Sequence, residues 1–328
     1  MPRAVALFSG GLDSMLAVRL MQEQGFLVDA LNVRTIYSCC HSTAARAAAA
    51  LGLRLTVVPV GDDYLEVIRN PLYGYGRGVN PCVDCRIHMC RMAGRFMAEV
   101  DACVVITGEI VGQRPMSQRK HQLEIIARRS GLGDRLLRPL SAKLLPPTEV
   151  ELEGLVDRRK LCGFNGRSRR HLMELARRLG VVAIPSPSTG CALTEPLFAR
   201  RVRDLMQLHP QAVRWDFELL SHGRHFRFDR LTKVVIGRSL EDNASLRQFA
   251  AREDAPRTTL LAPDNFRGPD ALVVGRASGP ALGYAGTLVL RYAGRDDPSG
   301  LWLQVTRPGR QRLIPVPTDE AARSATTL

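Results

Sequence analysis

A hexapeptide of small and polar residues, SGGLDS at Ser9–Ser14, directly follows the apolar run Ala4–Phe8. An apolar run of this length predicts a buried strand, and the residues after it predict a tight turn into a helix. Free backbone N–H groups and the positive end of the helix dipole meet at such a turn. The two glycines allow close approach of a ligand, and the two serine hydroxyls add donors. The segment is therefore predicted to bind phosphate.

A simpler reading explains the glycine pair alone, as a turn in which Asp13 or Ser14 caps the helix. The strand, turn and helix in sequence favour phosphate binding instead. The chain has no Gly-Lys pair, which excludes a Walker-type loop. The segment resembles the PP-loop of the ATP pyrophosphatases, which cleave ATP between the α and β phosphates and transfer AMP to a substrate oxygen. This resemblance implies that ATP and Mg²⁺ are bound by Ser9, Gly10, Gly11, Leu12, Asp13 and Ser14.

Residues 1 to about 205 alternate between short apolar runs and helical segments. The alternation predicts right-handed crossovers and an α/β fold, a doubly wound and mostly parallel sheet covered on both faces. Ligands bind such sheets at the carboxyl ends of the strands, where the hexapeptide lies. The expected strands are Ala4–Phe8, Leu27–Val33, Leu55–Val60 and Ala102–Thr107, and the expected helices span 14–24, 42–51, 85–99 and 117–129.

A chain of 328 residues exceeds what one core usually supports, so two domains are expected. After Trp215, short apolar runs separated by turn residues predict a smaller C-terminal α+β domain with antiparallel strands and one or two helices. The expected domains are 1–210 and 211–314, followed by a flexible tail at 315–328. The expected elements are strands at Lys233–Ile236, Thr259–Ala262, Leu272–Val274, Thr287–Tyr292 and Trp302–Val305, with a helix at Asn243–Arg252.

The chain carries 46 lysines and arginines against 32 acidic residues, a net charge of +14. Such an excess predicts a polyanionic partner, RNA in particular. A bias toward GC-rich codons explains arginine in place of lysine but does not explain the excess over acids. The runs Arg158–Lys160 and Arg167–Arg170 are expected to contact RNA or to form a solvated helix face. No apolar run reaches the roughly 18 residues of a membrane span, so a cytoplasmic protein without a membrane partner is expected.

A C-x-x-C motif, Cys82 to Cys85, follows Asn80-Pro81 at the start of a helical segment. Eight cysteines in a chain of this length indicate reduced thiols or metal ligands more than disulfides. Helix N–H groups, together with Arg86 and His88, are expected to favour thiolates. The motif alone does not distinguish zinc, an iron–sulfur cluster, a redox pair and chance.

A third cysteine, Cys191, lies in a loop rich in turn residues, Pro185–Thr194. It is expected to be more exposed than Cys90 and Cys103, which are predicted to be buried structural cysteines. Only the fold could bring Cys191 to the C-x-x-C motif, because 191 − 82 = 109 residues separate it from Cys82.

Four motifs together resemble the tRNA thiouridine synthetases of the PP-loop superfamily, over about residues 1–200. The 4-thiouridine synthetases share TGE-x-x-GQ-x-x-SQ, and the tRNA 2-thiouridylases share NPC-x-x-C. The resemblance implies a tRNA substrate and a sulfur donor, either sulfide or a cysteine desulfurase. It adds Gly108 and Gln113 to the nucleotide site and makes Arg114, Ser117 and Gln118 candidate contacts to nucleotide or RNA phosphate. The motifs are SGGLDS, NPCVDC at Asn80–Cys85, the segment Val105–Gln118, and Gly190-Cys191.

In this group, a C-x-x-C and one distant cysteine either form a persulfide and disulfide pair or hold a 4Fe-4S cluster with one open iron. The presence of both members of the C-x-x-C favours a cluster ligated by Cys82, Cys85 and Cys191. Zn²⁺, or no metal, is the alternative. The implied catalytic residues are Asp13, Cys82 and Cys191.

The segments His222–Arg227, Lys233–Arg238 and Asn243–Leu246 resemble the NFACT-type RNA-binding domain. A small β-rich domain with solvated arginines is the plainer reading. The N-terminal RNA-binding extension and the C-terminal sulfurtransferase module of many 4-thiouridine synthetases are not found in this sequence, so neither their tRNA docking nor their sulfur relay is expected. Two other classes compete: an ATP-dependent amide- or nitrogen-transfer ligase for a small molecule, and a non-catalytic RNA-binding protein.

Overall fold

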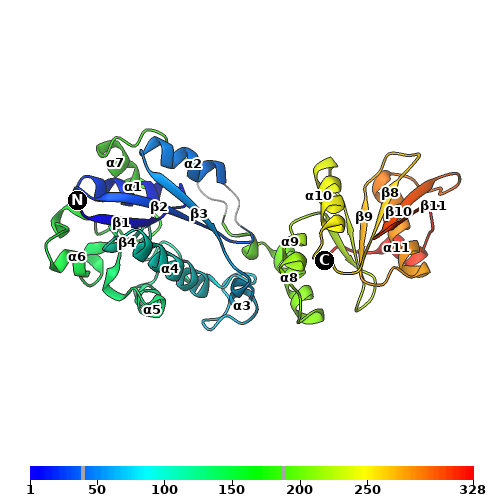
Figure 1. The fold of residues 1–328 in the computed structure, drawn as a ribbon, viewed down its shortest axis with the longest axis horizontal. Coiled ribbons are helices and arrows are strands. Elements are labelled where there is room, and N and C mark those ends of the chain that lie inside the picture. The colour runs from blue at the N-terminus through cyan, green and yellow to red at the C-terminus, as the bar shows by residue number, and fades with distance from the viewer. Residues whose placement is uncertain (38–40, 187–189) are drawn as a thin grey trace. The chain divides into compact units, whose positions relative to one another are not determined.

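The computed structural model describes residues 1–37, 41–186 and 190–328. The chain divides into two compact units, Met1–Thr194 and Glu195–Leu328 (Figure 1). The division expected at residue 210 falls after a helix, α8 (Pro196–Leu208), that belongs to the second unit. Among the described residues, no helix is both long and apolar enough to cross a bilayer.

The first unit is built on a five-stranded sheet in the order β3-β2-β1-β4-β5, and every pair is parallel. The predicted α/β fold is confirmed. The strands are β1 (Arg3–Leu7), β2 (Leu27–Arg34), β3 (Arg54–Pro59), β4 (Val104–Thr107) and β5 (Leu136–Leu137). The helices are α1 (Leu12–Gln22), α2 (His41–Ala50), α3 (Asp63–Arg69), α4 (Cys82–Glu99), α5 (Lys120–Ser130), α6 (Glu149–Leu152) and α7 (Arg170–Arg178), with short turns at Gly133–Arg135, Ala142–Leu144, Arg158–Lys160 and Ala192–Thr194.

The strand order reverses at β1, which lies between β2 and β4. Figure 1 shows α1, α2 and α7 on one side of the strands and α3, α4 and α5 on the other. Loops after β1 and β4 therefore leave the sheet in opposite directions, and the space between them is where such folds bind ligands.

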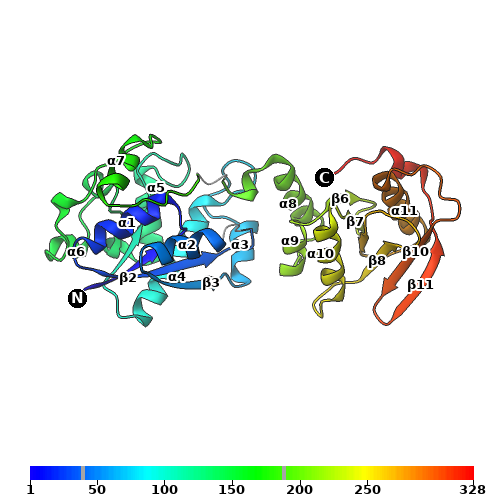
Figure 2. The ribbon, with the colours of Figure 1, turned by 90° about the horizontal axis from the view of Figure 1, so that it is seen from above.

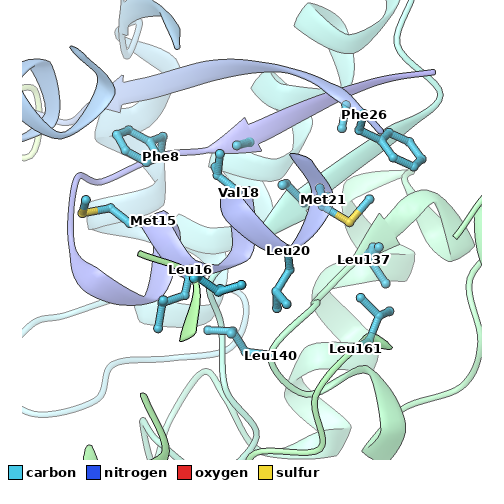
Figure 3. Packing of buried hydrophobic residues seen from close by; sticks show 14 of the residues in the cluster. Phe8, Met15, Leu16, Val18, Leu20, Met21, Phe26, Leu137, Leu140 and Leu161 are labelled. Carbon is cyan, nitrogen blue, oxygen red and sulfur yellow. The ribbon is translucent and has the colours of Figure 1, made fainter. Parts of the chain in front are cut away.

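Most side chains of the first helix, α1, are buried in the core of the unit. Its residues Leu16 and Met21 are fully buried, as is Leu140 from the segment after β5 (Figure 3). Burial of side chains of this size stabilises the fold by about 1.5–3 kcal/mol each. The start of α1, which follows the hexapeptide turn, is consequently held in a fixed position.

The second unit is built on an antiparallel sheet in the order β11-β10-β8-β9-β7-β6. One face packs on α11, and Trp215 and α10 cover the other (Figure 2). The α+β prediction is confirmed. The elements are α8 (Pro196–Leu208), α9 (Arg214–Leu219), β6 (Arg224–Arg227), β7 (Lys233–Ile236), α10 (Leu240–Ala251), β8 (Thr258–Pro263), β9 (Ala271–Val274), α11 (Gly279–Ala293), β10 (Trp302–Arg307), β11 (Arg310–Pro315) and a short turn at Glu320–Ser324.

Three features of this unit differ from the sequence expectation. Residues Thr287–Tyr292, expected as a strand, lie in α11, where positions 281–290 are all buried. A helix that is apolar all round gives no helical periodicity to read. Residues 211–314 also hold three α-helices, α9, α10 and α11, where one or two were expected. Finally, the expected flexible tail packs on the unit: the Asp319 amide donates to Thr287 Oγ1 at 2.7 Å, and the Leu328 amide donates to the His225 carbonyl at 2.9 Å.

Candidate active site

The turn between β1 and α1 is shaped by close backbone contacts. Gly10 has a φ of +75°, and a Cβ built there would lie 2.6 Å from Ala44 Cα. A Cβ on Gly108, directly after β4, would lie 2.5 Å from the carbonyl carbon of Asp13. Only glycine fits at either position, since real side chains do not approach backbone so closely. The turn after β1 is thereby packed against α2, and the residue after β4 is packed against the first turn of α1.

Hydroxyl groups and N–H groups surround this turn. Ser14 Oγ donates to the Gly11 carbonyl at 2.8 Å and lies 3.4 Å from Ser9 Oγ. The Gly11 amide donates to Ser9 Oγ at 3.3 Å. Helix α1 begins at Leu12, so the N–H groups of its first turn face the space beside the loop. The geometry is that of an anion site at a helix N-terminus.

Asp13 lies in the first turn of α1 and accepts a hydrogen bond from Gln113 Nε2 at 3.0 Å. Burial raises the pKa of the Asp13 carboxyl above its ordinary value, while the Gln113 bond and the charges of Arg169 and Arg114 oppose that rise. Sequence analysis predicts Gln113 and Arg114 here, but it assigns Arg169 to an RNA-contact run. Two guanidinium groups therefore face the phosphate loop.

Both cysteines of the C-x-x-C lie in the first turn of α4, which begins at Cys82 and not at residue 85 as expected. Cys82 Sγ donates to Ser117 Oγ at 3.1 Å. Ser117 is fully buried and belongs to the same loop as Gln113. One loop, residues 108–118, thus contacts the phosphate loop through Gln113 and the C-x-x-C through Ser117.

Cys85 accepts a hydrogen bond from Tyr64 Oη at 3.1 Å. Burial raises the pKa of the Cys85 thiol to about 11, although the Tyr64 bond and Arg86 oppose the rise. The expected thiolate is therefore not found at this cysteine, because desolvation outweighs the helix terminus. His88 does not supply the expected charge either, since burial lowers its pKa.

The loop that carries Cys191 is attached to the residues just before the C-x-x-C motif. The Val79 amide donates to the Leu193 carbonyl at 3.0 Å, and the Thr194 amide and hydroxyl close a turn on the Cys191 carbonyl. Cys191 is close enough to raise the pKa values of Cys85 and Tyr64 electrostatically. The fold thus brings Cys82, Cys85 and Cys191 into one neighbourhood despite their separation in sequence.

These thiols do not form a ready metal site. Within residues 1–37, 41–186 and 190–328, no three histidine, cysteine or acidic side chains are grouped so that they could hold a metal ion. Among the described residues, Cys82, Cys85, Cys90, Cys103 and Cys162 form no disulfide. Cys90 is buried, as predicted, and burial raises its pKa to about 12. Cys39 and Cys40 lie outside the described residues.

A buried carboxylate links the phosphate-loop side of the sheet to α4. Glu109 Oε2 accepts from Arg138 Nε at 3.0 Å, and Glu109 Oε1 lies 3.6 Å from Arg86 Nε. Burial alone would raise the pKa of Glu109, but Arg138 and Arg86 outweigh it and the pKa is lowered. Because Arg86 directly follows Cys85, this ion pair sets the position of the first turn of α4 relative to β4.

The remaining candidate contacts divide into structural and accessible groups. Arg158 is structural, because it pairs with Glu151 and donates to the Ala142 and Leu145 carbonyls. Arg170 pairs with Glu174 on the surface of α7. Gln118 is buried, and its Oε1 has no hydrogen-bond partner among the described residues.

Sequence reasoning missed two parts of the site. Tyr64 lies on α3, and nothing in the sequence around it marks it as a partner of Cys85. A cavity of 230 Å³ beside Gly10 is lined by α2 and by Ala183–Pro185. No motif signals this cavity, because its walls come from three distant segments.

A family model matches part of each unit. Residues 2–143 match the family model described as thiamine biosynthesis protein (ThiI), and residues 223–323 match the model described as NFACT protein RNA binding domain. Over 57 residues the chain is 51% identical to the 7-cyano-7-deazaguanine synthases of Xanthomonas campestris and Xanthomonas oryzae, covering 16% of this chain. The chain spans only 25% of the length of these relatives.

A solved structure titled as a predicted subunit of tRNA methyltransferase from Methanocaldococcus jannaschii is similar over 54% of this chain and 76% of that one, at 15% identity and a TM-score of 0.35.

Proposed function

We propose that this chain, which combines a ThiI-type PP-loop domain with an NFACT-type RNA-binding domain, is an ATP-dependent tRNA sulfurtransferase. It adenylates a base carbonyl oxygen, that of uridine, and replaces it with sulfur. One observation carries the proposal: loop 108–118 binds Asp13 of the phosphate loop through Gln113 and Cys82 through Ser117. ATP activation and sulfur handling then belong to one site.

ATP is bound by its phosphates on the turn Ser9–Ser14, where the N–H groups of α1 and the serine hydroxyls meet. The Asp13 carboxylate is an oxygen ligand of the type that Mg²⁺ prefers. Arg114 and Arg169, which face Asp13, neutralise the developing charge on pyrophosphate. The 230 Å³ cavity beside Gly10 accepts the nucleoside end.

The reaction has two displacements. The base oxygen attacks the α-phosphorus, and the bond to pyrophosphate breaks, which leaves an adenylated base. A sulfur nucleophile then attacks the activated carbon and expels AMP, which carries the original oxygen away. Because the reacting atoms belong to a base, the RNA must present that base unstacked.

Gln118 supports a base in this position. Its Oε1 is a buried acceptor that has no partner among the described residues, and a buried acceptor is normally satisfied. A base N–H entering beside Cys82 and Ser117 would supply that partner. This gives the buried end of the 108–118 loop a role in binding the substrate.

The sulfur carrier has two forms to be distinguished. Cys82, Cys85 and Cys191 would hold the 4Fe-4S cluster predicted from the sequence, and the cluster would supply an open iron for hydrosulfide. The described thiols are not grouped as a metal site, so no step is derived through a cluster. In the other form, a persulfide on Cys191 supplies the sulfur, Cys82 resolves it as a disulfide, and an external thiol reductant restores both cysteines.

Pyrophosphate release tests the ATP step. Asp13→Asn should reduce tRNA-dependent pyrophosphate release by roughly 100-fold or more, since it removes the carboxylate at the phosphate loop. Asp101→Asn is the matched control, because Asp101 is exposed and asparagine tolerates its φ of +52°. Equal release by Asp13→Asn and the unmutated chain would refute the role of the loop.

Metal analysis distinguishes the two carriers. Iron, zinc and acid-labile sulfide are measured on protein purified without oxygen, for the unmutated chain, Cys191→Ala and the control Cys162→Ala. Iron and sulfide that are lost only in Cys191→Ala would establish a shared cluster. Protein without iron that accumulates a persulfide on Cys191 would establish the other carrier. Zinc alone would make the three cysteines structural and contradict the sulfur step.

A small-molecule ligase is the second candidate, favoured by the 57-residue likeness to 7-cyano-7-deazaguanine synthases. Such an enzyme would cleave ATP with a carboxylate substrate and ammonium, and it would need no RNA. Pyrophosphate release that is independent of tRNA but dependent on ammonium would favour this candidate.

A further inference from the structure

A shallow groove of 790 Å³ runs between α4, α5 and the turn that follows α5. Its lining contains no acidic side chain among the described residues, and each of its arginines is exposed. We refer to it as the arginine groove, after Arg91, Arg95, Arg128, Arg129 and Arg135.

The helices place these arginines on facing walls. Arg91 and Arg95 are four residues apart on α4 and therefore share one face, about 6 Å apart along the axis. Arg91 donates from Nε and Nη2 to the Arg129 carbonyl, at 3.2 and 3.0 Å, and so ties α4 to the end of α5. Gly131, with a φ of +80°, ends α5 and turns the chain back toward the groove. The side chain of Arg91 thus holds the two walls together, and all five arginines are exposed.

Ion pairs among the described residues leave the positive charge of the groove unneutralised. Among the described residues, Arg95, Arg128, Arg129 and Arg135 form no ion pair with a carboxylate, in contrast to Arg138 and Arg158. The charge of two groove arginines acts on His88 of the same helix: the pKa of His88 is lowered by burial and further by Arg95 and Arg91, against the opposing effect of Asp63. Clustered cations without counter-charges attract a polyanion and release its counterions.

We infer that the arginine groove binds the phosphate backbone of the tRNA substrate. The inference rests on the proposed function, since that proposal supplies RNA as the polyanion. Helix α4 begins at Cys82 in the candidate active site, and Arg95 lies 13 residues farther along, about 20 Å at 1.5 Å per residue. An RNA whose phosphates bind in the groove would therefore place a different nucleotide, about 20 Å away, in the candidate active site. Phosphate contacts of this kind position an RNA without reading its sequence.

The test measures binding of the full chain to bulk deacylated tRNA across a series of salt concentrations. The groove variant is Arg95→Gln, Arg129→Gln and Arg135→Gln together; Arg91 is kept because it holds α5. The matched control is Arg54→Gln, Arg177→Gln and Arg178→Gln, three exposed arginines outside the groove. Both variants change the net charge equally.

We expect the groove variant to bind tRNA at least about tenfold more weakly and its log–log salt slope to fall by about two to three, one for each lost phosphate contact. The control should change the slope by less than about one. Equal losses in the two variants would show a non-specific charge effect and overturn the inference. An unchanged groove variant would also overturn it, and would leave an acidic protein as the partner to seek.

The proposed function can fail separately. Direct binding needs no turnover, so a chain that shows no tRNA-dependent pyrophosphate release can still lose tRNA affinity through the groove variant. The converse result is that the groove variant binds tRNA with full affinity while Asp13→Asn loses pyrophosphate release. That pair of results would refute RNA binding in the groove and would support the proposed enzymatic activity.

Discussion

The phosphate loop and the cysteine neighbourhood lie on the same unit but are built in different ways. Main-chain packing fixes the loop, because Gly10 and Gly108 leave no room for a side chain. Side chains from other segments, Tyr64 and Ser117, fix the cysteines. The residues of the phosphate loop are consecutive in the sequence, whereas the cysteine neighbourhood is assembled from segments that are far apart in it.

The largest expected effect tests whether main-chain packing fixes the phosphate loop. Gly108→Ala would place a Cβ 2.5 Å from the Asp13 carbonyl carbon, and both partners are backbone that cannot yield cheaply. The start of α1 should move, and pyrophosphate release should fall by roughly 100-fold or more, since shifts of about 1 Å have that effect. Gly279→Ala is the control, because a Cβ there meets nothing within 4 Å. Full activity in Gly108→Ala would show that the loop is not fixed by this packing.

The next effect concerns the ion pair that connects the two regions. Glu109→Gln leaves Arg138 buried without its counter-charge, so the free energy of unfolding should fall by about 3–5 kcal/mol. The exposed pair Arg170–Glu174 gives the control, and Glu174→Gln should cost less than about 1 kcal/mol. Urea denaturation measures both. A similar decrease in the free energy of unfolding of the two variants would show that the buried Glu109 pair matters no more to stability than the exposed pair.

The same pair sets a pH dependence. The folded pKa of Glu109 is lowered, so its contribution is fully present above its ordinary value of 4.5 and disappears as the pH falls through the folded pKa. The difference in stability between the unmutated chain and Glu109→Gln should shrink correspondingly in acid.

A smaller effect tests the burial of the cysteines on α4. Burial raises the pKa values of the Cys85 and Cys90 thiols to about 11 and about 12, so both should resist iodoacetamide at pH 8 in the folded chain and react after unfolding. Tyr64→Phe removes a bond that lowers the Cys85 pKa and should leave Cys85 no more reactive. Peptide mass spectrometry identifies the labelled cysteines. Rapid labelling of Cys85 in the folded chain would contradict the described environment.

The smallest effect concerns Gln113. Its hydrogen bond lowers the pKa of Asp13, so Gln113→Ala should move the acid limb of pyrophosphate release to higher pH, by less than about one pH unit. Gln211→Ala, an exposed glutamine in the second unit, should leave the limb in place. A shift to lower pH in Gln113→Ala would show that the Gln113 bond does not stabilise the carboxylate.

The α/β fold of the first unit and the phosphate loop follow from the sequence because both depend on local patterns, apolar runs for the strands and glycines for the turn. The order of the strands in the sheet is known only from the structure. Helix α11 was not predicted, because its residues 281–290 are all buried and so show no alternation of apolar and polar residues with a helical period. The raised pKa of Cys85 was not predicted either, because its cause is burial, which depends on how the chain folds around this cysteine. A backbone hydrogen bond from Val79 to Leu193 attaches the Cys191 loop to the residues before the C-x-x-C, and no motif in the sequence indicates this bond.

The most direct test of the account is to look for the product. The full chain is incubated without oxygen with tRNA, ATP, Mg²⁺ and a sulfur donor, which is sulfide in one reaction and cysteine with a cysteine desulfurase and a thiol reductant in the other. The RNA is then digested to nucleosides for mass spectrometry. The account predicts a nucleoside in which sulfur replaces one oxygen, formed only with ATP and lost in Asp13→Asn. Cleavage of ATP to AMP and pyrophosphate with no sulfur in the RNA would contradict it.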